Sequence, residues 1–464
     1  PERICFCVEA AHAKRRRTMR IIHYLHGLPP VRTGGLVTYA LDLATCQRML
    51  GYDVYLLLPG HPGKKAQIPY VRENGNWKNI PVFRIENALP VPMGKGIKCP
   101  QLFLRHVDSG VFSSFWDRLM PDVVHVHSLM GLPPTVIQSA VERDIKTILT
   151  THDYFGLCCR PDRIDYQGKN CYRKSWDECQ KCSVEAYGFP RMYLEQTDMF
   201  SKLMECSWFS SFLETLAIRR NHASVKKEAR SENEMVQRDY SALYEQYRKL
   251  LRSFRIIHYN SRQSWEIYHR LCPELMQGYR IPMCAAGITD QRRTRYYRNR
   301  TLRFGFLGNN SYYKGLKKLL DAADRLLSEK FSFTIRIFCE NPYGNRKYLE
   351  KNSPFSQSEV DEVYDSFDVL IVPSICEETF SLVVLEALSR AIPCVISDKV
   401  GAKDLLLETG GGAIYYGADG LKDSLERILN RPELLEEWNR NIMSAHMELD
   451  YKKYVEKLTT RYYR

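Results

Sequence analysis

Two glutamates have a spacing that suits the binding of sugar or ribose hydroxyls. Glu378 and Glu386 lie eight positions apart, and both follow a strand-sized apolar run at 369–372. If a helix begins near Phe380, Glu378 lies in the loop before it and Glu386 about two turns into it. Both carboxylates then face one crevice, where they accept hydrogen bonds from hydroxyl groups. Taken alone, the pair also fits two solvated acids beside an amphipathic helix.

The start of the same helix is a candidate anion site. The first N–H groups of a helix have no partner within it, and they carry a partial positive charge. We therefore expect the backbone N–H groups of Phe380, Ser381 and Leu382 to bind an anion such as a phosphate.

A cluster of cysteines is a separate signal. Five of the fifteen cysteines fall between residues 158 and 182, where even scatter would place about one. Cys179 and Cys182 form a C-x-x-C pair, and Cys171 with Cys158 or Cys159 would complete four thiolate ligands for a structural zinc ion. Reduced thiols without a metal, and disulfide or redox chemistry, are the alternatives.

These residues require a scaffold of strands and helices. From Met19 the pattern is an apolar strand at 21–25, a glycine-containing loop, a helix that ends at Gly51 and a strand at 54–58, which together form a βαβ unit. Further strands are expected at 123–126, 147–150 and 256–259. Strands mostly separated by helix-length segments indicate a parallel, doubly wound α/β sheet.

A second series of strands and helices follows a basic stretch at 292–300, within a linker expected near 283–300. Its strands are expected at 303–307, 333–338, 369–372 and 394–397, and its helices near Lys314, Glu359, Phe380 and Asp419. With 464 residues, the chain is too long for one hydrophobic core. We therefore expect two α/β domains.

The domain boundaries follow from this pattern. We expect a non-native or disordered leader, a first domain that starts at Met19, two insertions in it, a second domain and a final helix that crosses back to the first domain. The leader covers 1–18, the first domain 19–285, the cysteine-rich insertion 153–190, the helical insertion 191–252, the second domain 286–430 and the final helix 431–464. In the helical insertion, Met235, Tyr240, Leu243, Tyr247 and Leu251 lie close to one helical stripe, which predicts a helical hairpin.

The composition restricts the class of protein. The sequence is 44% hydrophobic and 26% charged, which is ordinary for a globular protein and excludes a disordered or collagenous chain. No stretch approaches the roughly 20 apolar residues that span a bilayer. A net charge of +13 favours phosphate-bearing partners or an anionic membrane surface, and solubility alone would also explain it. Fifteen cysteines without a secretory signal indicate reduced thiols in the cytosol.

Several dispersed motifs occur in one order along the chain. They are GGLVTYALDLA at 34–44, HVHS at 125–128, TTHD at 150–153, FGFLGNNSYYKGLKKLLDAADRL at 304–326 and ETFSLVVLEALSRAIPCVISD at 378–398. Together they resemble the retaining glycosyltransferases of family 4, whose GT-B fold has two Rossmann-like domains facing across a cleft. The resemblance covers most of residues 19–430. A related bacterial polysaccharide branch carries a similar cysteine-bearing insertion after its T-x-H-D motif, in a position that suggests a lid on the acceptor side.

The resemblance implies roles for individual residues. Gly34 and Gly35 would let backbone amides approach the diphosphate of the donor, and Lys314 would hold its phosphates. His152 would lie beside the transferred sugar. Glu378 would bind hydroxyls of that sugar, and Glu386 those of the ribose.

One position departs from the family pattern. The family has an arginine shortly after the glycine of the first strand of the second domain, and this chain has Asn309 there. One cation instead of two would then neutralise the leaving group, unless an arginine of the basic stretch 292–300 replaces the missing one. The alternative interpretation of that stretch is a solvated linker.

The resemblance implies a retaining glycosyltransferase that moves a sugar from a nucleotide-sugar donor to a saccharide or lipid-linked saccharide, without a metal at the reaction centre. Cell-surface polysaccharide synthesis at the inner face of the plasma membrane is the expected setting. A catalytically inactive nucleotide-sugar-binding or scaffold protein is the alternative, because of Asn309. Nucleic acid is not an expected partner, since no recognition motif accompanies the positive charge.

Overall fold

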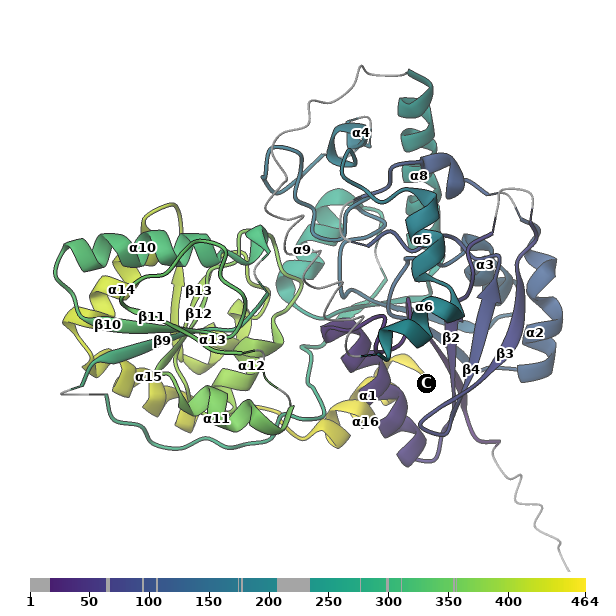
Figure 1. Ribbon diagram of the computed structural model, residues 1–464. Helices are drawn as coiled ribbons and strands as arrows, with labels where there is room; N and C mark the ends of the chain where they lie inside the picture. The colour runs from purple at the N-terminus through teal and green to yellow at the C-terminus, as the bar shows by residue number, and fades with distance from the viewer. Residues whose placement is uncertain are drawn as a thin grey trace, which may run out of the picture.

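The computed structural model describes residues 17–63, 67–93, 96–105, 107–173, 175–176, 178–206, 234–275, 277–297, 300–309, 311–353, 355 and 357–464. Figure 1 shows two lobes, each built around one sheet. The predicted leader lies almost entirely outside the described residues, as does the stretch 207–233 of the helical insertion.

The first lobe contains a mixed sheet. Its strands are β1 (Arg20–Tyr24), β2 (Asp53–Pro59), β3 (Tyr70–Trp77), β4 (Ile80–Glu86), β5 (Val123–Val126), β6 (Lys146–Thr150), β7 (Ile256–Tyr259) and β8 (Tyr279–Arg280). Within the described residues they run in the order β3-β4-β2-β1-β5-β6-β7-β8. All neighbours are parallel except β3 and β4, which form an antiparallel hairpin. β1, β5 and β6 are almost fully buried, as expected for strands covered on both faces.

Helices surround this sheet. They are α1 (Gly35–Met49), α2 (Ser113–Leu119), α3 (Pro134–Glu142), α4 (Cys179–Cys182), α5 (Phe189–Glu195), α6 (Asp198–Met204), α8 (Glu234–Ser253) and α9 (Arg262–Leu271), with the 3₁₀ turns η1 (Pro100–Leu102) and η2 (Ser109–Phe112). On α8, Tyr240, Leu243, Tyr247 and Leu251 are buried, whereas Met235 is 67% exposed. Met235, in the first turn of α8, therefore does not share the buried stripe of the other four residues.

The second lobe contains a fully parallel sheet in the order β11-β10-β9-β12-β13-β14. Its strands are β9 (Leu302–Phe306), β10 (Phe333–Ile337), β11 (Leu349–Lys351), β12 (Val369–Val372), β13 (Cys394–Ser397) and β14 (Gly412–Tyr415). Its helices are α10 (Leu316–Ser328), α11 (Val360–Asp365), α12 (Leu382–Leu388), α13 (Lys403–Thr409), α14 (Gly420–Asn430) and α15 (Glu433–Ser444), with η3 (Tyr312–Lys314) and η4 (Gln357–Glu359). The prediction of two Rossmann-like α/β units is confirmed.

Two glycines allow loops at the carboxyl ends of the second sheet to pack closely against each other. Gly315 has φ +78°, and a Cβ atom there would lie 1.9 Å from the carbonyl oxygen of Pro373. A Cβ atom on Gly401 would lie 2.3 Å from the carbonyl oxygen of Thr379. Both positions therefore need glycine, because the loops after β9 and after β13 could not approach the loop after β12 so closely with a larger residue.

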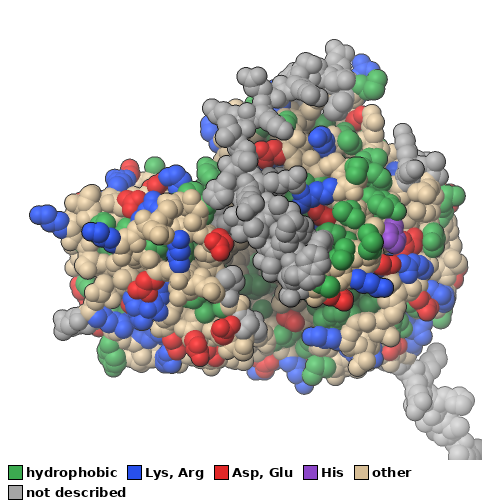
Figure 2. Space-filling model, in the orientation of Figure 1, with side chains coloured by type: hydrophobic (Ala, Val, Ile, Leu, Met, Phe, Trp, Pro, Cys, Tyr) green, Lys and Arg blue, Asp and Glu red, His purple; other side chains and the backbone are tan. Residues whose placement is uncertain are grey.

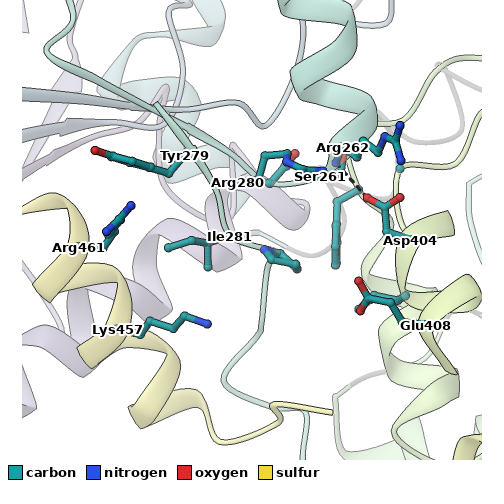
Figure 3. A pocket seen from close by; sticks show the side chains of 14 residues that line it. Ser261, Arg262, Tyr279, Arg280, Ile281, Asp404, Glu408, Lys457 and Arg461 are labelled. Carbon is teal, nitrogen blue, oxygen red and sulfur yellow. Dashed lines mark hydrogen bonds between the residues drawn. The ribbon is translucent and has the colours of Figure 1, made fainter. Parts of the chain in front are cut away.

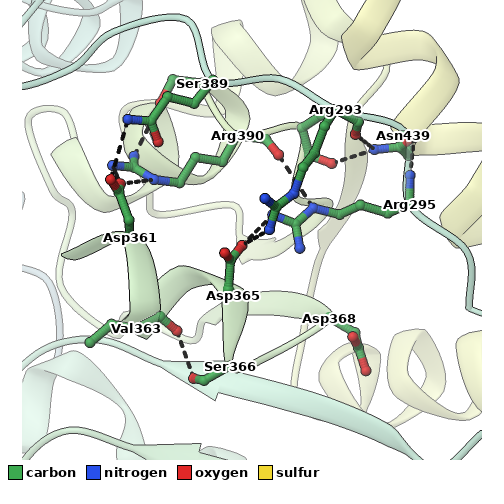
Figure 4. A network of polar contacts seen from close by, with 12 residues as sticks. Arg293, Arg295, Asp361, Val363, Asp365, Ser366, Asp368, Ser389, Arg390 and Asn439 are labelled. Carbon is green, nitrogen blue, oxygen red and sulfur yellow. Dashed lines mark hydrogen bonds and ion pairs between the residues drawn. The ribbon is translucent and has the colours of Figure 1, made fainter. Parts of the chain in front are cut away.

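The basic stretch at 292–300 is fastened to the second lobe (Figure 4). Arg295 donates to Asp365 at 2.9 Å, and Arg293 pairs with the same carboxylate. Asn439 of α15 donates to the carbonyl oxygens of Arg293 at 3.0 Å and Ala391 at 2.7 Å. These arginines are therefore structural, and they lie away from the loops that follow the strands.

The last helix, α16 (Tyr451–Tyr462), packs on the first lobe. Asp450 caps it by accepting from the Lys453 N–H at 3.1 Å. The hydroxyls of Tyr39 and Tyr454 lie 2.7 Å apart, and the Tyr462 hydroxyl donates to the Tyr279 carbonyl oxygen at 3.0 Å. The chain thus returns from the second lobe to the first with α16. Residues 431–464 do not form one crossing helix, because α15 lies in the same segment and packs in the second lobe.

Among the helices in the described part of the chain, none combines the length and the apolar character needed to cross a membrane. On the described part of the face in Figure 2, basic and acidic side chains are interspersed.

Candidate active site

A cavity of about 450 Å³ lies between the two lobes. Its wall includes Gly35, His152 and Asp153 of the first lobe, and Lys314, Glu378 and Ser381 of the second. His152 follows β6, Lys314 follows β9, and Glu378 follows β12. The cavity therefore lies beyond the carboxyl ends of parallel strands, where α/β sheets bind ligands.

Lys314 and Glu378 form an ion pair in the cavity wall. The Lys314 Nζ atom lies 2.8 Å from Glu378 Oε1, and the Ser374 hydroxyl also donates to this carboxylate. Burial favours the protonated form of Glu378, but Lys314 and the serine hydroxyls outweigh burial, so the pKa of Glu378 lies below its usual range. Burial likewise opposes the charge of Lys314, and Glu378 overcomes it, so the pKa of Lys314 is raised. Both groups are charged at neutral pH.

His152 lies on the opposite wall of the cavity. Its carbonyl oxygen accepts from the Thr379 hydroxyl at 2.9 Å, which joins the two lobes beside Glu378. Its ring lies 4.9 Å from the Tyr39 ring, centroid to centroid. Burial, and after it the nearby His258 and His26, lowers the pKa of His152 to about 3. His152 is therefore neutral at pH 7.

The helix after Glu378 begins later than expected. α12 starts at Leu382, and Ser381 precedes it with φ +133°. Within the described residues, the backbone N–H groups of Phe380, Ser381 and Leu382 donate to no protein acceptor, and all three residues line the cavity. They belong to a strained loop and the first residue of a short helix, so the geometry differs from that of a regular helix start.

Glu386 lies outside the lining of this cavity. Its carboxylate accepts from the Tyr364 hydroxyl of α11 at 2.6 Å, and burial raises the pKa of Glu386. Because α12 begins at Leu382, Glu386 is only one turn into the helix rather than two. Its carboxylate contacts α11 through Tyr364.

The first glycine loop lies partly at the cavity. Gly34 has φ +106° and precedes α1, and a Cβ atom on it would meet nothing within 4 Å. Gly35 lines the cavity, and a Cβ atom on it would lie 3.7 Å from Leu382 Cδ1 of the second lobe. The start of α1 therefore faces the loop that precedes α12.

Asn309 is exposed and does not line the cavity. Its Oδ1 atom accepts from the Ser311 N–H at 3.1 Å, which is a local turn contact. No arginine described within 292–300 replaces the missing family arginine. Each of them pairs with an aspartate instead: Arg292 with Asp290, Arg293 and Arg295 with Asp365, and Arg300 with Asp368.

Asp153 was not predicted as a site residue. It lines the cavity next to His152, and its Oδ1 atom accepts from the Phe155 N–H at 2.8 Å. Burial raises the pKa of Asp153 to about 6, against the effect of that hydrogen bond. Asp153 is the last residue of the TTHD motif. The position of this motif at the end of β6 is the one sequence signal that could have indicated that Asp153 lines the cavity.

A contact between the cysteine-rich insertion and the second lobe was also missed. The Arg163 side chain is 0% exposed and lies 2.7 Å from Glu377, the residue before Glu378. The rings of Tyr154 and Tyr172 lie 5.0 Å and 5.1 Å from its guanidinium. Asn170 adds two hydrogen bonds to the same loop, at 2.9 Å and 3.1 Å. The insertion therefore borders the cavity.

The predicted zinc site is not supported. In the described part of the chain, the one group with ligand atoms within 4.8 Å of each other is His23, His125 and His127. The sulfur atoms of Cys158, Cys171, Cys179 and Cys182 do not converge in this way. Burial raises the pKa of Cys182 to about 11, so this thiol is neutral at pH 7. Cys159 and Cys179 instead belong to the hydrophobic core around Trp176.

A second cavity of about 600 Å³ lies between the lobes beside α16 (Figure 3). Lys457 and Arg461 of α16 lie on one side of it, and Asp404 and Glu408 of α13 lie on the other. His152, Lys314 and Glu378 are not in its wall. The predicted chemistry therefore belongs to the smaller cavity.

Two family models match the sequence, one in each lobe. The model described as "Glycosyltransferase Family 4" matches residues 33–181, and the model described as "Glycosyl transferases group 1" matches residues 301–431. No curated protein matches the sequence.

Solved structures share the fold. Sucrose-phosphate synthase from Thermosynechococcus elongatus is 12% identical with a TM-score of 0.56, over 96% of this chain and 98% of that one. The catalytic domain of starch synthase IV from Arabidopsis thaliana, bound to ADP and acarbose, is 13% identical with a TM-score of 0.53, over 96% and 99%. The lipopolysaccharide outer core galactosyltransferase WaaB, in its apo form, is 12% identical with a TM-score of 0.54, over 96% and 100%.

These likenesses establish a GT-B fold, and the two family models add the activity. The chain is a glycosyltransferase with the GT-B fold.

Proposed function

We propose that this glycosyltransferase retains the anomeric configuration of the sugar that it moves from a nucleotide-sugar donor to a saccharide or lipid-linked saccharide. The observation that carries the proposal is the pairing of Lys314 and Glu378 in a cavity between the lobes, opposite His152. A cation beside a carboxylate suits a ligand that joins a diphosphate to a sugar.

The pair also suggests how the donor binds. A diphosphate that reaches Lys314 competes with Glu378 for the ammonium group, since both offer anionic oxygens. The Glu378 carboxylate is then free to accept hydrogen bonds from hydroxyls of the sugar. Lys314 stabilises the nucleotide diphosphate as it leaves, because a fixed cation near the departing oxygen stabilises charge that develops in the transition state. The backbone N–H groups of Phe380, Ser381 and Leu382 are further donors in the same wall.

Retention is proposed with the acceptor attacking on the face that the nucleotide leaves. No metal is required for this step in the proposal, because Lys314 supplies the positive charge. Glu386 is proposed to contact the ribose only after its bond to Tyr364 is exchanged for a ligand hydroxyl.

Two likenesses support the choice of substrates. Starch synthase IV is bound to ADP and acarbose, a nucleotide with a saccharide, and WaaB is a galactosyltransferase of the lipopolysaccharide outer core. We therefore propose that this enzyme acts in the synthesis of a cell-surface polysaccharide, with peripheral association at the inner face of the plasma membrane. The net charge of +13 favours an anionic surface.

A second candidate function is that of a nucleotide-sugar-binding protein without turnover. It is favoured by Asn309, which lies outside the cavity and leaves Lys314 as the cation predicted for the phosphates.

The test is a screen of nucleotide sugars by thermal shift, followed by turnover. A donor that binds the native state raises the apparent Tm, and an active enzyme then slowly releases the nucleotide diphosphate in the absence of an acceptor. With an acceptor, NMR of the anomeric proton of the product should show the configuration of the donor. Binding without any release of nucleotide would favour the second candidate, an inverted product would contradict retention, and a folded protein that binds no nucleotide sugar would overturn both.

A further inference from the structure

Five histidines form a cluster at the carboxyl edge of the first sheet. His23 lies in β1, His125 in β5, and His258 in β7, while His127 and His152 follow β5 and β6. His23, His125 and His258 are 0% exposed and His127 is 1% exposed. Of the five, His152 lines the cavity between the lobes. The cluster therefore extends from the interior of the sheet to the site.

Three of these rings form a continuous chain of hydrogen bonds. Gln47 Oε1 lies 2.7 Å from His23 Nε2, and His23 Nδ1 lies 3.0 Å from His127 Nε2. His127 Nδ1 then lies 3.2 Å from His152 Nε2. At the far end, the Gln47 amide nitrogen donates to the Thr459 hydroxyl of α16 at 3.3 Å. The amide nitrogen of Gln47 thus contacts α16, and its oxygen faces His23.

All three imidazoles are neutral at pH 7. Burial lowers the pKa of His23 to about 4 and that of His152 to about 3, and burial and the neighbouring histidines hold the pKa of His127 well below its usual value. A neutral imidazole has one N–H donor and one bare nitrogen. The hydrogen bond that one nitrogen makes therefore decides what the other nitrogen offers.

The amide oxygen of Gln47 gives the chain a direction, because a carbonyl oxygen only accepts. His23 must donate from Nε2, so its Nδ1 is bare and accepts from the Nε2–H of His127. The Nδ1 of His127 is then bare and accepts from the Nε2–H of His152.

We propose that Gln47, acting through His23 and His127, fixes the tautomer of His152, so that His152 presents a bare, hydrogen-bond-accepting Nδ1 to the cavity. His152 is only partly buried. Its Nδ1 atom does not belong to the set of buried polar atoms without a hydrogen-bond partner. Nδ1 is thus the ring atom left for a ligand. Gln47, His23 and His127 are positioning residues in this scheme.

The consequence concerns substrate choice and rests on the proposed function. A bare Nδ1 accepts a hydrogen bond from a hydroxyl of the bound sugar, and it repels a group that can only accept, such as fluorine in place of that hydroxyl. The opposite tautomer would have the reverse preference.

The alternative use of this cluster is metal binding, since ligand atoms of His23, His125 and His127 lie within 4.8 Å of one another. Every nitrogen of these three rings already has a hydrogen-bond partner. His125, for example, contacts the hydroxyls of Tyr463 and Thr150. A metal would have to break several of these bonds, whereas the neutral chain satisfies them all.

The direct test is ¹⁵N NMR of histidine side chains in the full-length protein without ligand, with His152 assigned from a His152→Gln variant. We expect His23, His127 and His152 each to show a protonated Nε2 and a bare Nδ1 between pH 6 and pH 8, as neutral imidazoles should at about one unit or more above their pKa. A protonated Nδ1 on His152, or a doubly protonated ring, would overturn the proposal. This measurement does not depend on whether the enzyme acts on a nucleotide sugar.

Two buried substitutions provide the matched comparison. Gln47→Met keeps the side-chain length but removes the oxygen, so His152 should become a mixture of tautomers and kcat/KM should fall about threefold to thirtyfold, as for one lost hydrogen bond. Thr150→Val breaks the separate contacts of His125 and His258 at 2.7 Å and 3.0 Å and should leave the His152 signals unchanged and kcat/KM within about twofold. Unchanged His152 signals in Gln47→Met, or equal effects of the two variants, would contradict the proposal. If Gln47→Met does not fold, the wild-type spectrum alone still decides.

Discussion

At Glu378, two opposing effects act on one carboxyl group, and their balance explains how the site can be charged and buried at once. Burial favours the protonated acid, but Lys314 at 2.8 Å and hydroxyl donors favour the carboxylate, and the net pKa is lowered. The pair keeps both charges available in the wall of the cavity between the lobes. A ligand with an anionic part and hydroxyl groups can take over both contacts. Its anionic part then pairs with Lys314 in place of Glu378, and its hydroxyls donate to Glu378 in place of Lys314.

The first prediction compares the two lysines at the start of α10. Lys314→Ala should reduce kcat about tenfold to a thousandfold, since roughly 1.4 to 4 kcal/mol of transition-state stabilisation is lost with the cation. Lys317→Ala removes an exposed lysine that pairs with Asp321 at 2.8 Å and should stay within about twofold. Glu378→Gln should fall in the range of Lys314→Ala, because charge-assisted hydrogen bonds to the sugar are roughly twice as strong as neutral ones. Steady-state kinetics on folded variants measure this; wild-type turnover in Lys314→Ala and Glu378→Gln would contradict the proposed mechanism.

The second prediction concerns Asp153 and pH. Its pKa is raised to about 6 in the fold, above about 3.9 in the unfolded chain. The folded state therefore holds this proton more tightly, and stability falls as the pH rises from about 4 through 6. Asp153→Asn keeps the acceptor for the Phe155 N–H, so it should stabilise the protein by up to roughly 3 kcal/mol at pH 7.5 and by less than about 1 kcal/mol at pH 4. Urea unfolding at both pH values measures the difference; a gain that is the same at both would show that Asp153 is not the group responsible.

Some site residues could be predicted because each belongs to a short contiguous motif. Lys314 and Glu378 came from such motifs, and the structure places both in one cavity wall. Arg163 could not be predicted, since its partner Glu377 lies more than two hundred positions away, in the other lobe. The orientation of Glu386 was missed for a local reason, because the strained backbone at Ser381 delays the start of α12.

Among the elements, the strands were the easiest to predict. The runs at 123–126, 256–259, 369–372 and 394–397 match β5, β7, β12 and β13 in both bounds, because strands buried on both faces are continuous apolar runs. β3 escaped prediction because it contains Asn74, Gly75 and Asn76 and has no buried residue. The sequence of β3 lacks the alternation of apolar and polar residues that marks a strand with one buried face. β3 is a strand because it pairs with β4.

The third prediction concerns how the cysteine-rich insertion is held to the second lobe. Arg163→Met leaves Glu377 buried without its cation, which should destabilise the protein by about 3 to 5 kcal/mol, whereas Arg163→Met with Glu377→Gln should recover much of the loss. Arg255→Met is the control, because Arg255 and Asp144 form an exposed pair that contributes about 0 to 1 kcal/mol. Chemical denaturation of the four proteins gives the values. Equal costs for Arg163→Met and Arg255→Met would show that the contact does not fasten the insertion.

The fourth prediction concerns metal in the same insertion. Because the sulfur atoms do not converge on a common centre, we expect the purified protein to contain far less than one zinc ion per chain. A strong chelator should then leave Tm and activity unchanged, because a fold that does not depend on a bound metal loses nothing when the metal is removed. Elemental analysis and a melting curve with and without chelator measure both quantities. Stoichiometric zinc, with a lower Tm after its removal, would restore the tetrathiolate site predicted from the cysteine spacing.

For the whole molecule, the last helix links the two lobes. The hydrophobic cluster around α16 joins Ile21, Tyr39 and Leu43 of the first lobe to Phe380 and Leu385 of the second. Phe380 also lines the cavity that holds Glu378. Packing of α16 is thus coupled to the loop that carries the site.

The last prediction tests which lobe depends on α16. Leu458 in α16 and Leu425 in α14 are both 0% exposed, so Leu→Ala at either should cost about 2 to 5 kcal/mol. Leu425 belongs to the core of the second lobe, whereas Leu458 packs with β1, β5 and β6 of the first. If the lobes unfold in separate steps, Leu458→Ala should lower the same calorimetric transition as Leu43→Ala, and Leu425→Ala should lower the other one. If they unfold together, hydrogen exchange should instead increase around β1 for Leu458→Ala and around β9 for Leu425→Ala. If Leu458→Ala instead lowers the separate transition that Leu425→Ala lowers, or increases exchange around β9 rather than β1, α16 depends on the second lobe despite its contacts with the first.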